Sequence, residues 1–137
     1  AQVRDLVERG YRRVARGWFT GQCDHFGGLM GVRPASIGIR DPRTRWGSCS
    51  SSGAVSFSWR LMMAPMRVAE YVVVHELCHL YYHGHGKRFY ALLEAVLPDW
   101  RQRKQRIEEG QVEDVFPYPQ EIRFIHQSGH APVAQAA

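Results

Sequence analysis

Lysine is scarce in this chain of 137 residues, which contains 2 Lys against 16 Arg. With 13 acidic residues the formal net charge is +5, and guanidinium groups carry nearly all of the positive charge. Guanidinium groups bind phosphates and carboxylates through paired hydrogen bonds. Nucleic acid or an acidic substrate is therefore a possible partner. Charges on solvated faces, with arginine used in place of lysine, are the simpler explanation.

The chain also lacks a long apolar run, a secretory signal pattern and a C-x-x-C pair. No stretch approaches the roughly 20 apolar residues of a membrane-spanning helix. The three cysteines, Cys23, Cys49 and Cys78, cannot all pair with one another. We therefore expect no membrane anchoring and a reducing, cytoplasmic location. A chain of this length forms one domain, or part of a longer protein, with a single modest core.

Hydrophobic periodicity predicts a domain that contains both helices and strands, the α+β class. Alternating residues predict strands near 37–39 and 55–59, separated by a loop or irregular edge over 43–53. Three- and four-residue spacing predicts helices over 2–18, 67–82 and 89–97, a short one over 23–30, and a basic one from Trp100 to Ile107. Gly84 is the expected stop of the helix over 67–82. Residues 1–109 are expected to form the domain, and 110–137 an extended or partly disordered tail.

The most informative motif is His75-Glu76-Leu77-Cys78-His79, on the helix predicted over 67–82. Residues four apart project from the same helix face, so His75 and His79 can bind one metal ion. Glu76 is rotated by roughly 100° around the helix axis, which places its carboxylate beside the metal rather than among the ligands. There it can take a proton from a bound water. The motif predicts a catalytic zinc site, with one Zn²⁺ per chain and Glu76 as general base.

A catalytic zinc site has three protein ligands and one open position, so a third ligand is needed. His85, six residues after His79, is the favoured candidate, and His83 is expected at the surface. Glu94 on the following helix is the alternative, either as a ligand or as a partner that orients an imidazole. A purely structural zinc is disfavoured because a closed site would require a fourth protein ligand.

Two groups of segments resemble the YgjP-like metallopeptidases, relatives of the SprT and WLM minimal zincins. They are Arg45-Trp46-Gly47-Ser48-Cys49-Ser50 with Trp59-Arg60-Leu61 and Ala64-Pro65, and residues 71–80 with His85-Gly86-Lys87-Arg88-Phe89. The resemblance covers roughly residues 30–107. It implies a minimal zincin-like core, in which a small antiparallel sheet packs on an active-site helix with flanking helices. It also implies zinc bound by His75, His79 and His85.

The segment Trp46-Gly47-Ser48 admits two roles. It can be an edge strand that pairs with an extended peptide substrate, which makes these three residues the predicted substrate-binding set. Alternatively, Trp46 caps the core and Gly47 makes a tight turn. Tyr71 and Tyr82 flank the predicted site, where a phenol could stabilise an oxyanion. Ordinary aromatic packing is the more common role for such residues.

These observations predict a zinc-dependent hydrolase, foremost a metallopeptidase that acts on a peptide or protein through a zinc-activated water and Glu76. One alternative is a metal-dependent hydrolase of a phosphate anhydride or ester, such as a nucleotide, with Arg43 or Arg45 supplying charge. Another is a DNA-associated protease related to SprT, in which a basic surface recruits the substrate. Nucleic acid is thus a possible partner but not a required one. The physiological substrate and the oligomeric state are not determined at this stage.

Overall fold

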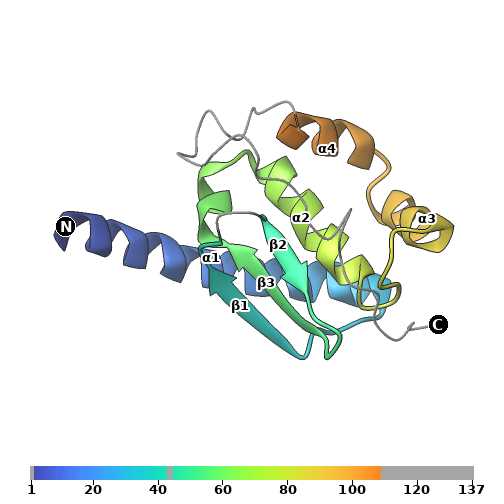
Figure 1. Ribbon diagram of the computed structural model, residues 1–137, viewed down its shortest axis with the longest axis horizontal. Coiled ribbons are helices and arrows are strands. Elements are labelled where there is room, and N and C mark those ends of the chain that lie inside the picture. The colour runs from blue at the N-terminus through green and yellow to red at the C-terminus, as the bar shows by residue number, and fades with distance from the viewer. Residues whose placement is uncertain (1, 43–44, 109–137) are drawn as a thin grey trace.

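The computed structural model describes residues 2–42 and 45–108 (Figure 1). The elements are the helices α1 (Gln2–Met30), α2 (Met66–Cys78), α3 (Lys87–Val96) and α4 (Trp100–Glu108), the strands β1 (Ser36–Arg40), β2 (Gly47–Cys49) and β3 (Ala54–Ser58), and the 3₁₀ helix η1 (Trp59–Met63). They confirm the predicted α+β class. None of the helices in the described ranges is long and apolar enough to cross a bilayer. The predicted tail over 110–137 lies outside the described residues.

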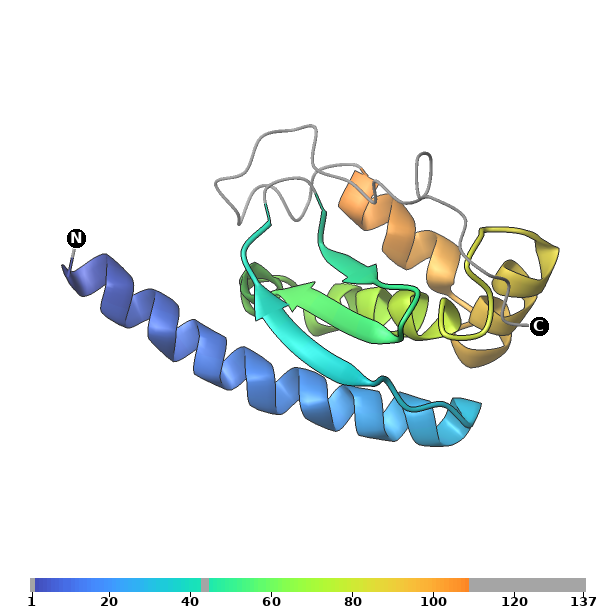
Figure 2. The ribbon, with the colours of Figure 1, turned by 60° about the horizontal axis from the view of Figure 1, so that its bottom comes forward.

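Helix α1 is continuous, whereas the sequence predicted two separate helices over 2–18 and 23–30. The glycines at positions 17 and 21 disfavour a helix, but Ala15, Phe19, Cys23 and Phe26 extend one buried stripe across them. Burial of this stripe outweighs the intrinsic cost of glycine, which is about 1 kcal/mol per residue. The helix ends at Met30 and is followed by Gly31, whose φ of +74° suits a residue without a side chain. Figure 2 shows the first turns of α1 extending past the other described elements.

The sheet has the strand order β1-β3-β2 and is mixed, not antiparallel as the resemblance implied. Strand β2 pairs antiparallel to β3, and β1 pairs parallel to β3, with Ile37 opposite Val55. The chain reverses between β1 and β2 and reverses again in the hairpin from β2 to β3. Because β3 then inserts between the two earlier strands, it must run parallel to β1. Local periodicity contains no information on this order of pairing.

Helix α2 is the central element of the core, and it packs on β2, β3, α1 and α4. Every residue from 71 to 79 is buried, as expected for a helix that is apolar on nearly all sides. The helix ends at Cys78, four residues before the predicted end. The N–H groups of His79, Leu80 and Tyr81 each bond a carbonyl three residues earlier, which tightens the last turn. Gly84 therefore lies beyond the helix end and is not its stop.

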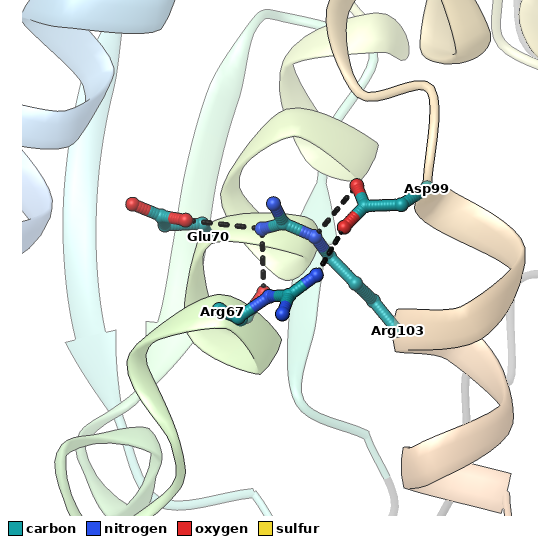
Figure 3. A network of polar contacts seen from close by, with 4 residues as sticks. All are labelled: Arg67, Glu70, Asp99 and Arg103. Carbon is teal, nitrogen blue, oxygen red and sulfur yellow. Dashed lines mark hydrogen bonds and ion pairs between the residues drawn. The ribbon is translucent and has the colours of Figure 1, made fainter.

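A network of ion pairs fastens α4 to the start of α2 (Figure 3). The Arg103 guanidinium donates to Glu70 Oε1 and Asp99 Oδ1, both at 3.0 Å, and to the Arg67 carbonyl at 2.9 Å. Arg67 also pairs with Asp99. Partial burial alone would raise the pKa of Asp99, but hydrogen bonds from both arginines lower it below its usual value. The Arg103 side chain is only 12% exposed, so solvent screens this network less than it screens an ordinary surface pair.

The two outer edges of the sheet differ. At β1, the guanidinium groups of Arg12 and Arg16 from α1 donate to the carbonyls of Ile39 at 3.2 Å and Ile37 at 3.1 Å. Side chains that hydrogen-bond to the carbonyls of an edge strand hinder the addition of another strand. Within the described ranges, no such hydrogen bond reaches the outer edge of β2. In the described part of the chain, arginine side chains thus bond the outer carbonyls of β1 and not those of β2.

Candidate active site

Three histidines from α2 and the segment after it converge on one point. The candidate ligand atoms of His75, His79 and His85 all lie within 4.8 Å of one another, and this cluster could bind a metal ion. The Nε2 atoms of His75 and His85 are 3.4 Å apart. Two ligand nitrogens at the usual zinc distance, in a tetrahedral arrangement, are separated by about 3.3–3.4 Å. Both the chemistry and the spacing of this donor set thus fit zinc.

The orientation of the His79 ring is set by the turn that follows α2. Its Nδ1 lies 2.9 Å from the carbonyl oxygen of Tyr82. Because a carbonyl can only accept, Nδ1 carries the proton and Nε2 is left with the lone pair that a metal needs. The early end of α2 makes this contact possible, since the chain must fold back to bring Tyr82 to the ring. Tyr82 contributes a backbone carbonyl here, a role that its side-chain chemistry does not predict.

Tyr71 lies behind His75, on the previous turn of α2. Its phenol oxygen is 3.5 Å from His75 Nδ1, and only 1% of the residue is exposed. Burial raises the pKa of Tyr71 well above its ordinary value, so the phenol stays neutral. A phenol in this position supports the orientation of His75.

Helix α3 contributes a shared packing surface through Phe89, which is fully buried. The centroid of its ring lies 5.1 Å from that of His75, 4.7 Å from that of His79 and 4.8 Å from that of His85. One apolar ring thus limits the movement of all three imidazoles. Sequence analysis placed Phe89 on the apolar face of its helix but did not predict this role. The sequence signal for this packing was the four-residue spacing between His85 and Phe89.

Glu94, the rival third ligand, belongs to a different cluster at the surface. Its Oε1 accepts hydrogen bonds from Arg101 at 2.8 Å and from the Trp100 indole at 3.3 Å. These hydrogen bonds, foremost the one from Arg101, lower the pKa of Glu94. The side chain is 54% exposed. Among the described residues, the metal-type cluster contains His85 and not Glu94.

The side chain of Glu76 projects from α2 toward β2, and the residue is fully buried. The backbone of β2 passes directly over its side chain. A Cβ atom on Gly47 would lie 3.1 Å from Glu76 Cγ, 3.2 Å from Glu76 Oε2 and 3.0 Å from Val72 Cγ1. These distances are shorter than ordinary van der Waals contact. A glycine at position 47 therefore lets the edge strand approach the carboxylate this closely.

The other two residues of the predicted substrate-binding segment have different environments. Trp46 is buried, with 1% exposure, and its carbonyl accepts from the Ser58 N–H at 2.9 Å. Ser48 is half-buried on β2, and its hydroxyl lies 2.6 Å from that of Ser56. Ser48 points to the sheet face opposite Glu76, because neighbouring strand residues alternate. Of these three residues, Gly47 is the one for which the close approach to Glu76 is observed.

The remaining histidine and cysteine residues near the site are packed inside the protein. His83 is 8% exposed, so the prediction that it lies at the surface is wrong. The turn after α2 folds this residue back against the domain. Cys49 and Cys78 are buried, and burial, with a smaller contribution from Glu76, raises the pKa of each thiol to about 12. Thiols of such high pKa are protonated at neutral pH and are poor nucleophiles.

Comparisons with known proteins agree with this geometry. Residues 1–110 match the protein family described as YgjP-like, metallopeptidase domain. None of the curated proteins matches the chain. Among solved structures, the metallopeptidase zymogen of Pyrococcus abyssi abylysin is similar, with a TM-score of 0.60 and 20% sequence identity over 66% of this chain and 92% of that chain. At this level of identity the similarity concerns the fold.

Proposed function

This chain belongs to the YgjP-like metallopeptidase family, and we propose that it hydrolyses peptide bonds with zinc bound by His75, His79 and His85 and with Glu76 as general base. The observation that carries this proposal is the convergence of three imidazoles, one of which, His75, adjoins the buried carboxylate of Glu76 on α2. Three protein nitrogens leave a fourth position free for water and substrate, as in catalytic zinc sites.

Zinc is the metal that this donor set favours, because three neutral imidazoles suit a borderline-soft ion better than Mg²⁺ or Ca²⁺. A zinc ion bound here would supply Lewis-acid polarisation of a carbonyl and of water. The protein's part is to hold the three rings. The Tyr82 carbonyl orients His79, the Tyr71 phenol supports His75, and Phe89 packs against all three imidazoles.

Glu76 would move the proton in this reaction. Its carboxylate accepts a proton from the attacking water and then delivers it to the leaving amine. The adjacent position of His75 in the sequence, and the helical rotation between them, place Glu76 beside the metal position rather than in it. The packing of Gly47 over the carboxylate limits the conformations that this side chain can adopt.

The substrate would lie as an added strand along the outer edge of β2. Ser58 N–H donates to the Trp46 carbonyl and Ser50 N–H donates to the Ala54 carbonyl, so residues 46 and 50 face β3. Because hydrogen-bonding direction alternates in an antiparallel pair, the backbone groups of Gly47 and Cys49 face outward. They can bond an extended peptide, and Gly47 would bring that peptide close to Glu76. Of the predicted set Trp46, Gly47 and Ser48, we assign Gly47 the central role.

A methyl group at position 47 tests this arrangement. We expect Gly47→Ala to displace the Glu76 carboxylate and lower kcat/KM by roughly tenfold to a hundredfold, since misplacement of a catalytic group by about 1 Å has effects of that size. Zinc content should be unchanged, because no histidine moves. Gly28→Ala is the matched control, since its Cβ would meet no atom within 4 Å. Unchanged kcat/KM in Gly47→Ala would contradict the role of this close approach.

Removal and restoration of the metal test the proposed function itself. The purified protein should cleave an unfolded protein such as casein, measured as the release of soluble fluorescent peptides. Treatment with 1,10-phenanthroline should abolish cleavage, and one equivalent of Zn²⁺ should restore it. Hydrolysis of nucleoside triphosphates without any peptide cleavage would instead favour the phosphate-ester alternative. Cleavage that persists after complete removal of the metal would contradict the proposal.

A further inference from the structure

A groove of about 650 Å³ lies on the outer face of the sheet, on the side opposite α2. Its floor is a row of small residues that are in register across the three strands. Gly38 of β1 is opposite Ser56 of β3, which is opposite Ser48 of β2. The hydroxyls of Ser48 and Ser56 are 2.6 Å apart. The small size of these side chains produces the hollow, and their hydroxyls make it polar.

Two arginines mark one end of this groove. Arg40 is the last residue of β1, and Arg45 precedes β2, so the register of the strands places both at the same end of the sheet. The Arg40 side chain folds back over its own strand, since its Nε would be 3.6 Å from a Cβ on Gly38. Among the described residues, those that line the groove include four serines and no carboxylate. Within the described part of the chain, neither arginine forms an ion pair.

The position of the groove relates it to the edge of β2. A peptide added along this edge has side chains that point alternately to the two faces of the sheet. One set faces α2 and the metal cluster, and the other set lies beside Ser48, on the face that carries the groove. Side chains of the second set are within reach of Arg45, which is exposed at the start of the strand.

We propose that this groove is a substrate subsite that selects an acidic side chain, Asp or Glu. The selected positions of the bound peptide are those whose side chains point to the sheet face that carries the groove. The inference rests on the proposed peptidase function and on strand addition at β2. Arginine binds a carboxylate through two parallel hydrogen bonds, and serine hydroxyls can donate to the same group. The net charge of +5 attracts acidic segments to the protein as a whole.

The lining favours a peptide over a nucleic acid. Proteins that bind single strands of nucleic acid combine a basic track with aromatic rings on which the bases stack. In the described ranges, the residues that line this groove include no aromatic side chain, and its two arginines lie together at one end. A carboxylate on a strand added to β2 would first meet Arg45, which precedes β2, while Arg40 on β1 lies farther along the same end of the groove.

This subsite is tested with two quenched fluorogenic peptides that are otherwise identical. One has Glu and the other has Gln at the positions whose side chains point to the sheet face that carries the groove. The zinc-loaded wild type should cleave the Glu peptide with a kcat/KM at least fivefold higher. The ratio should fall to about one, or invert, in Arg40→Glu/Arg45→Glu, and also in the milder Arg40→Gln/Arg45→Gln. Arg13→Glu is the matched control, since Arg13 is exposed on α1 away from the groove, and it should keep the wild-type ratio.

Fluorescence anisotropy with the zinc-loaded Glu76→Gln variant supplies a readout that does not depend on turnover. The labelled Glu peptide should bind at least fivefold more tightly than the Gln peptide, and Arg40→Glu/Arg45→Glu should remove the difference. Equal cleavage and equal binding of both peptides would overturn the subsite while leaving the peptidase function intact. Preferential binding of a single-stranded oligonucleotide that depends on both arginines would also overturn it. Cleavage of neither peptide, nor of casein, would contradict the proposed function, on which the subsite depends.

Discussion

Replacing Glu76 with Gln should lower the rate of peptide cleavage by about 10²–10⁴-fold while zinc remains bound, because general-base catalysis contributes acceleration of this size. Gln has nearly the same shape as Glu, so it fits the buried space under Gly47 without a cavity or a clash. It cannot accept the proton of the attacking water at neutral pH. The expected loss is therefore in kcat, with little change in KM.

The measurement is steady-state cleavage of a quenched peptide, with zinc content determined by elemental analysis of the same preparations. Glu70→Gln is the matched control on α2, since it makes the same chemical change at the pair with Arg103, away from the histidines. It should keep the wild-type kcat, although its stability is expected to fall. Most of the activity surviving in Glu76→Gln would remove this residue from the catalytic role.

Replacing His85 with Ala should reduce zinc binding more severely than any change outside the ligand set. Loss of residues that merely orient a ligand costs roughly 10–100-fold in metal affinity, so loss of a ligand should cost more than 100-fold. His85 brings its Nε2 to 3.4 Å from that of His75, whereas Glu94 is engaged with Arg101 and Trp100. We therefore expect near one zinc per chain in the wild type and much less in His85→Ala.

Glu94→Ala is the control that separates the two candidate ligands. It should retain near one zinc per chain and most of the peptidase activity, since its carboxylate lies in the surface cluster with Arg101. Isothermal titration of the metal-free proteins with Zn²⁺ gives the affinities directly. Full zinc affinity in His85→Ala, together with weak binding in Glu94→Ala, would reassign the third ligand to Glu94.

The metal cluster was largely predictable because its geometry is local. Helical periodicity alone brings His75 and His79 to one face, and zinc chemistry then requires a third nitrogen or oxygen nearby. The choice between His85 and Glu94 could not be made in this way, because it depends on how the chain turns after α2. That turn begins at Cys78, and a single contact between His79 and the Tyr82 carbonyl accompanies it.

The role of the segment Trp46-Gly47-Ser48 depends on contacts that local sequence patterns do not predict. The motif around Gly47 was recognised, but its two roles, edge strand and tight turn, could not be separated from the sequence. The structure shows an edge strand whose glycine lies against Glu76, 29 positions later in the chain. Burial of Trp46 and the outward direction of Ser48 likewise follow from the register with β3.

By itself, the sequence determined the α+β class, the family resemblance and the histidine motif, and it offered Glu76 as the candidate general base, since these follow from periodicity, residue chemistry and short spacings. Only the tertiary structure decided the mixed strand order, the early end of α2, the burial of His83 and the packing of Phe89 against three imidazoles. It also decided that Arg12 and Arg16 donate to the carbonyls at the outer edge of β1, and that Gly47 of β2 lies against Glu76. These features arise from contacts between segments distant in the chain, whose free energies depend on how the whole core packs and not on the preferences of any one segment.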